Sequence, residues 1–107
     1  MDEFARACRA ALAPMGAHAL FYGHIGDGNI HVAVVVPCAA PQPKHAVCTL
    51  VYGLVGEFRG TVSAEHGIGT IKKEFLPLAR SPEEIALMRR IKAALDPDGI
   101  LNPGKVF

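Results

Sequence analysis

The chain has 107 residues, which is the length of one small domain or of a piece of a larger one. Half of its residues are hydrophobic and its mean hydropathy is +0.26, which excludes an intrinsically disordered chain. Lys and Arg number 11 against 10 Asp and Glu, so there is no basic excess with which to bind nucleic acid. No apolar run is long enough for a transmembrane segment, and the N-terminus lacks the basic region of a signal peptide. We therefore expect a cytoplasmic protein.

The three cysteines, Cys8, Cys38 and Cys48, do not indicate a disulfide framework. Their number is odd and no two of them have the C-x-x-C spacing. We interpret them as small apolar side chains in a protein of a reducing compartment.

Four elements are predicted in the first half of the chain from apolar spacing and from the positions of glycine and proline. They are a helix over residues 2–15, strands over 17–24 and 30–36, and a helix over 44–58. The turn-forming residues 26–29 separate the two strands, which predicts a β-hairpin.

The second half is predicted to hold a short strand over residues 61–63, a Gly-rich turn, and a short helix over 70–76 that stops at Pro77. A capping box that begins at Ser81 opens a last helix, which runs to Leu95. The apolar residues expected to point inward from this helix are Ile85, Met88, Ile91 and Leu95.

This order of elements predicts an α+β fold, with an antiparallel sheet backed by helices and a helical C-terminal segment. Two or three strands make a thin sheet, and we expect one of its faces to be poorly covered in the isolated chain. Exposed apolar surface of this kind predicts self-association.

Two histidines flank the hairpin turn. If the turn is centred on Asp27 and Gly28, His24 and His31 are directly opposed, with Cβ atoms about 4.5–5.5 Å apart. Such a pair of imidazoles suits a divalent cation, for which Glu65 would be a third ligand and His66 a nearby general base. The alternative is that each histidine is an ordinary core or surface residue, which is how we interpret His18 and His45.

The glycines around these residues also have two interpretations. In the first, the glycines only provide positive φ in tight turns; they are Gly26, Gly28, Gly67 and Gly69. Alternatively, residues 67–70 can form a phosphate-binding loop before a helix. The glycines of the hairpin are not a dinucleotide fingerprint, because the third glycine is missing and a strand follows them.

Three segments together resemble one family. They are residues 24–31 (HIGDGNIH), residues 63–69 (SAEHGIG), and Ile91-Lys92 with residues 96–105 (DPDGILNPGK). They resemble the motifs H-x-G-D-G-N-x-H, S-G-E-H-G-I-G and I-K…D-P-x-G-I-L-N-P-G-K of the FAD-linked oxidases of the vanillyl-alcohol oxidase superfamily. The similarity is to the D-2-hydroxyacid dehydrogenase branch, which includes D-lactate dehydrogenase, the glycolate oxidase FAD subunit and D-2-hydroxyglutarate dehydrogenase.

The resemblance implies a function and a set of site residues. The family oxidises a D-2-hydroxy acid to the 2-oxo acid with hydride transfer to FAD. The implied roles are metal ligation, usually of zinc, by His24, His31 and Glu65, catalytic base for His66, and flavin-side positions for Asn29 and Asn102. Two departures are Ala33, where several members have a substrate-contacting asparagine, and Ala64, where the motif has glycine.

The resemblance also implies that residues 1–107 are the C-terminal part of a partial ferredoxin-like, substrate-binding cap domain, without the N-terminal FAD-binding domain. The expected partners are a small 2-hydroxy acid and an unidentified electron acceptor, and the full-length protein can be membrane-peripheral. The alternatives are a stand-alone module that binds a metal or a carboxylate, and a structural remnant without turnover.

Overall fold

The structure, a computed structural model, describes residues 1–107 and divides into two units, residues 1–58 and 59–107. Each unit is described by itself. The elements of the first unit are α1 (Asp2–Leu12), the 3₁₀ turn η1 (Ala13–Met15), β1 (His18–His24), β2 (Asn29–Val35) and α2 (Lys44–Glu57). The mixture of helices and antiparallel strands confirms the α+β class.

The N-terminal helix ends where the sequence indicates. Pro14 lies in η1, and Gly16 follows with φ +63°, a left-handed conformation that glycine adopts without a Cβ penalty. The backbone N–H of Gly16 donates to the carbonyl of Ala13 at 2.9 Å. This reversal leads the chain directly into β1.

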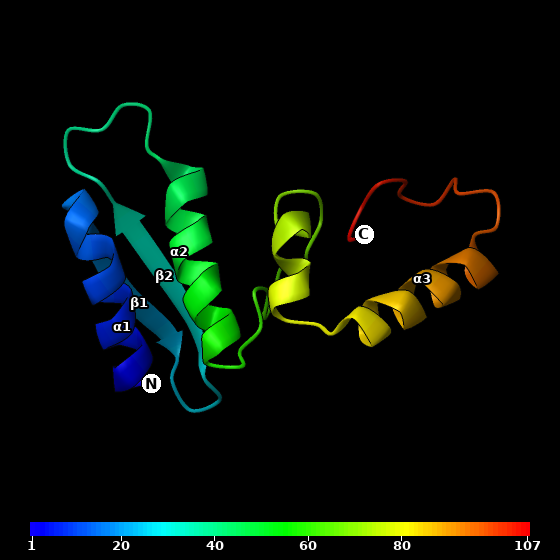
Figure 1. The fold of residues 1–107 in the computed structure, drawn as a ribbon, viewed down its shortest axis with the longest axis horizontal. Coiled ribbons are helices and arrows are strands. Elements are labelled where there is room, and N and C mark those ends of the chain that lie inside the picture. Colours follow the sequence, from blue (N-terminus) through cyan, green and yellow to red (C-terminus); the bar gives the residue numbers. More distant parts are fainter. The chain divides into compact units, whose positions relative to one another are not determined.

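The two helices of the first unit cover one face of the β1–β2 hairpin (Figure 1). Cys8, Leu12 and Val51 are the buried centre of this packing. The partly buried residues packed around them are Phe4, Met15, Ala17, Ala19, Phe21, Val34, Val47 and Leu54. Burial of the Cys8 thiol raises its pKa, and this fits its interpretation as a small apolar side chain.

The opposite face of the hairpin, which we call the outer face, has no helix of its own unit over it. Leu20, Tyr22 and Val35 alternate with the core-facing residues of their strands, and more than half of each side chain is exposed. The expectation of a poorly covered sheet face is therefore confirmed.

The second unit contains the 3₁₀ helix η2 (Lys73–Leu78) and the helix α3 (Pro82–Leu95). The predicted strand over 61–63 is wrong: no strand of this unit is present to pair with it, and the Thr61 hydroxyl donates locally to the Ser63 carbonyl. The prediction that Pro77 ends the preceding helix is also wrong, because Pro77 lies inside η2. Backbone hydrogen bonds from Phe75 and Ala79 hold the segment on either side of the missing proline N–H.

The capping box at the start of α3 is confirmed. The Glu84 N–H donates to Ser81 Oγ at 3.2 Å, and the Ser81 N–H donates to Glu84 Oε2 at 2.7 Å. At the other end, the buried Asp96 carboxylate accepts hydrogen bonds from the backbone N–H groups of Ile100 and Leu101 and from Lys92 Nζ. The Lys92 side chain, above all, lowers the pKa of Asp96 below its ordinary value.

The predicted inward face of α3 is wrong for two of its residues. No residue of α3 is buried, and Ile91 and Leu95 are 52% and 75% exposed. The apolar spacing specifies which face of a helix needs a cover, but it does not specify what covers that face.

Candidate functional site

The prediction that His24 and His31 are directly opposed in the hairpin is wrong. His24 pairs with Asn29, and His31 pairs with Tyr22. The turn lies earlier than the prediction placed it: the loop is Ile25–Gly28, and its centre falls between Gly26 and Asp27. The Asn29 N–H donates to Asp27 Oδ1 at 3.1 Å, which fixes this position.

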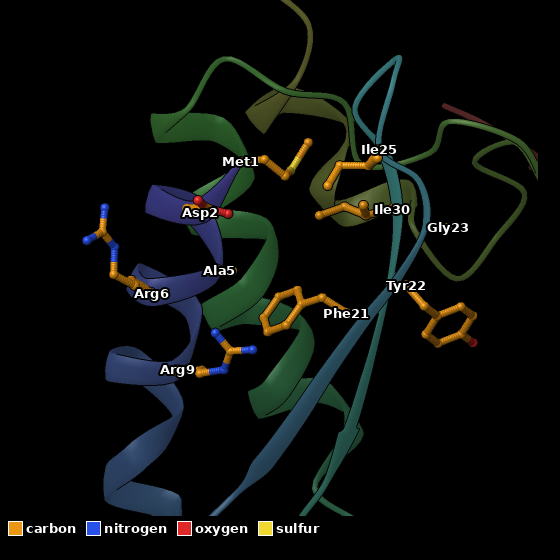
Figure 2. Close-up of a pocket in the computed structure, with 10 residues that line it drawn as sticks. All are labelled: Met1, Asp2, Ala5, Arg6, Arg9, Phe21, Tyr22, Gly23, Ile25 and Ile30. Atoms are coloured by element: carbon orange, nitrogen blue, oxygen red, sulfur yellow. The ribbon is translucent and has the colours of Figure 1, made fainter.

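The two histidines nevertheless lie on the same face. Successive side chains of a strand alternate, so the directly paired residues Tyr22 and His31 share the outer face with His24 and Asn29. Figure 2 shows Phe21 directed toward α1 and Tyr22 directed to the opposite side of the hairpin. His24 and His31 are thus diagonal neighbours. In antiparallel pairs, diagonal neighbours are about 7–8 Å apart, and their Cβ atoms are somewhat closer.

Glu65 and His66 lie in the other unit, on a loop without regular structure. His66 Nε2 is 3.8 Å from Glu65 Oε2, and the two side chains are 80% and 37% exposed. The loop is held by Ser63 Oγ, which donates to the Gly67 carbonyl at 2.6 Å, and by Lys72 Nζ, which donates to Ser63 Oγ at 3.2 Å. Glu65 and His66 therefore lie on an exposed loop that the hydrogen bonds of Ser63 and Lys72 hold in place.

The C-terminal tail is attached to the segment that follows this loop. The Val106 N–H donates to the Gly69 carbonyl at 2.8 Å, and Lys73 Nζ donates to the Gly104 carbonyl at 3.2 Å. Asn102 opens the turn that precedes these contacts, at φ +48°. The Asn102 turn and the Glu65–His66 loop are thus linked within one unit, although they lie far apart in the sequence.

Sequence reasoning did not identify Tyr22, Ser63 or Lys72 as site residues. Tyr22 stacks on His31, with ring centroids 5.1 Å apart and an interplanar angle of 17°. The correct hairpin register would have indicated this pair, since it places Tyr22 directly opposite His31. Ser63 and Lys72 hold the loop through hydrogen bonds for which we found no signal in the sequence.

The predicted metal ligands are divided between the two units. Within either unit, no group of three or more His, Cys, Asp and Glu side chains lies together in a way that could hold a metal ion. His24 and His31 belong to one unit, whereas Glu65 and His66 belong to the other. The donor types, two imidazoles and a carboxylate, suit zinc, and the hairpin brings the two imidazoles to one face.

A pocket of about 470 Å³ lies between α1 and the hairpin (Figure 2). Phe21, Ile25 and Ile30 provide much of its apolar lining, and the Arg9 guanidinium lies over the Phe21 ring, 4.8 Å from its centroid. None of the six predicted site residues lines this pocket. The predicted site residues therefore lie outside this pocket, although Tyr22, one of its lining residues, also stacks on His31.

None of the helices has both the length and the apolar character needed to span a bilayer.

Comparison with known proteins identifies the family. The sequence model of the C-terminal domain of FAD-linked oxidases matches residues 1–106. A D-2-hydroxyglutarate dehydrogenase of Xanthomonas citri pv. viticola is 52% identical over 82% of this chain and 20% of its own length. The mitochondrial D-2-hydroxyglutarate dehydrogenase of Bos taurus is 46% identical over 92% of this chain and 18% of its own length.

An uncharacterised FAD-linked oxidoreductase of Mycobacterium tuberculosis is 41% identical over the whole of this chain and 23% of its own length. The chain thus spans about a fifth of the length of these relatives. With a family match that covers all but one residue, the chain belongs to the FAD-linked oxidases, in the region of their C-terminal domain.

Proposed function

We propose that this chain is the substrate-side part of a flavin-dependent dehydrogenase that oxidises a D-2-hydroxy acid to the corresponding 2-oxo acid. The observation that carries the proposal is the family match over residues 1–106, together with relatives named D-2-hydroxyglutarate dehydrogenase at 46–52% identity. Lactate, glycolate and 2-hydroxyglutarate are the candidate substrates.

The outer face of the hairpin supports a role in metal binding. His24 and His31 project from the same face of two adjacent strands, and no helix of their unit covers that face. We propose that these imidazoles, joined by the Glu65 carboxylate, hold a divalent ion, with zinc the best match to the donor types. The ion would polarise the hydroxyl and carboxylate oxygens of a bound 2-hydroxy acid.

His66 is the proposed general base. Its side chain is 80% exposed, so a substrate hydroxyl can approach it, and histidine is the side chain that most often acts as a general base. The Glu65 carboxylate lies beside it, with Oε2 3.8 Å from His66 Nε2. FAD, when bound, supplies the acceptor for the hydride that leaves the C2 carbon of the substrate.

Asn29 and Asn102 are the proposed flavin-side residues. Asn29 faces outward beside His24, and Asn102 lies in the turn that the C-terminal tail links to the Glu65–His66 segment. An amide side chain provides both a donor and an acceptor for the polar edge of an isoalloxazine ring.

The first test is the metal content of the purified, tag-free and dialysed chain, measured by plasma mass spectrometry. We expect close to one zinc per chain in the wild type, loss of that zinc in His31→Ala, and retention in the control His45→Ala, which changes a histidine in α2. A wild-type chain without metal would contradict the proposal that these residues hold the ion by themselves. Metal retained in His31→Ala would show that the hairpin is not its site.

The second test addresses the base in a flavin-loaded protein that carries this sequence. His66→Ala should slow reduction of the flavin by a D-2-hydroxy acid by about 100-fold or more, because general-base catalysis contributes about 10²–10⁴-fold. His18→Ala is the control, since His18 lies at the far end of β1 from the turn. An unchanged rate in His66→Ala would exclude the assigned role.

A further inference from the structure

Tyr22 is the residue of the outer face that lies directly opposite the proposed metal ligand His31. It is the cross-strand partner of His31, and the two rings are nearly parallel, with centroids 5.1 Å apart. Directly opposed aromatic side chains in an antiparallel pair gain from ring–ring contact beyond the area they bury. Tyr22 remains 59% exposed, so burial in the core does not account for its position.

A second feature confines the same imidazole. Gly23 has φ +127°, and a Cβ at that position would lie 3.3 Å from His31 Cδ2 and 2.9 Å from the Asn29 carbonyl oxygen. The His31 ring therefore lies close against the backbone of residue 23 as well as against the Tyr22 ring. Tyr22 and Gly23 together define the place of the imidazole over β1.

Stacking of this kind leaves the metal-binding chemistry of the imidazole intact. The two rings meet through their faces, whereas the lone pair with which an imidazole nitrogen binds a metal lies in the plane of the ring. The Tyr22 contact therefore restricts the orientation of His31 without occupying its nitrogen atoms. Outer-shell residues that orient metal ligands through hydrogen bonds commonly raise metal affinity by about 10–100-fold, and for a ring stack we take the lower end of that range.

We propose that Tyr22 is a positioning residue that presets the His31 imidazole for metal binding on the outer face. The proposal rests on the proposed metal-binding function of the hairpin, and it adds the residue that organises one ligand before the ion arrives. Tyr22→Phe keeps the ring and removes only the hydroxyl, so it should behave as the wild type. Tyr22→Leu removes the aromatic face.

The stacking is tested first, without metal, from the proton shifts of the histidine rings in ¹H–¹³C correlation spectra. The His31 signals are assigned by their loss in His31→Gln. They should be shifted upfield by the Tyr22 ring current in the wild type and in Tyr22→Phe, and should move toward unstacked values in Tyr22→Leu. His31 shifts that do not change in Tyr22→Leu would overturn the proposal.

The functional consequence is tested by titration with zinc alone. We expect Tyr22→Leu to bind about tenfold more weakly than the wild type, the lower end of the range for ligand-orienting residues, and Tyr22→Phe to bind equally well. The control Leu20→Ala shortens another exposed side chain of the outer face that does not pair with His31. Circular dichroism verifies that each variant is folded.

The two possible failures are distinct. Zinc affinity that is equal in Tyr22→Leu and the wild type would refute the positioning role while leaving the metal site intact. A wild-type chain that binds no zinc would refute the metal-binding function and the positioning role with it, whatever the ring shifts show.

Discussion

Gly23 provides the sharpest test of the hairpin, because alanine at this position meets two separate obstacles. Its φ of +127° lies in a region that L-residues rarely adopt, and such strain costs about 1–3 kcal/mol. An added Cβ would also lie 2.9 Å from the Asn29 carbonyl oxygen, a backbone atom that cannot turn aside, and overpacking costs about 1–3 kcal/mol. Allowing for partial relaxation, Gly23→Ala should destabilise the first unit by about 2–4 kcal/mol.

The assay can isolate the first unit without any label. The chain has no tryptophan, and both of its tyrosines, Tyr22 and Tyr52, belong to residues 1–58. Tyrosine fluorescence during urea unfolding therefore reports on that unit. The matched control is Gly26→Ala in the same hairpin, where an added Cβ meets no atom within 4 Å and φ is not positive.

The expected result is a large loss of unfolding free energy for Gly23→Ala and a change within about 0.5 kcal/mol for Gly26→Ala. Equal effects of the two substitutions would refute the reasoning, because only the first glycine has both the unusual φ and the close backbone oxygen. A small effect of Gly23→Ala alone would show that the strands can move apart at little cost.

Three further predictions concern the second unit. Ser81→Ala removes the side-chain half of the capping box and should destabilise α3 by about 1 kcal/mol, measured by the helical circular dichroism signal on heating. Because the pKa of Asp96 is lowered in the folded chain, its stabilising contribution should be present above the ordinary value of 3.8 and should be lost as pH falls through the lower, folded value; Asp96→Asn should flatten that part of the pH–stability profile. We also propose that the exposed apolar face of α3 makes the chain self-associate, so that Ile91→Lys should reduce the sedimentation coefficient, whereas a wild-type chain that sediments as a monomer would contradict this.

The first unit was predictable from the sequence because its determinants are local. The apolar periodicity of α1 and α2, the β-branched and aromatic strands, and the breakers Pro14 and Gly16 all specify the elements that the structure contains. The core then follows, since the apolar faces of both helices meet one face of the hairpin.

The second unit was less predictable because its order depends on contacts between distant residues. Two hydrogen bonds, Val106–Gly69 and Lys73–Gly104, join the tail to the segment after the Glu65–His66 loop. Contacts of this kind are not predicted by any periodic pattern in the sequence. The capping box was found because it is encoded within four residues, from Ser81 to Glu84. The apolar face of α3 was correctly recognised as apolar, but it has no cover within its own unit.

The shared face of His24 and His31 does not depend on where the centre of the hairpin turn lies. Side chains alternate along each strand, so a hairpin with an even number of loop residues puts His24 and His31 on one face wherever its centre falls. The observed four-residue loop moved the turn centre and changed the pair from opposed to diagonal, but it kept the shared face. An odd loop would have put the two imidazoles on opposite faces and removed the basis for a shared ion. The parity of the loop, more than its exact centre, therefore decides whether this hairpin can serve as half of a metal site, and the structure has the parity that such a site needs.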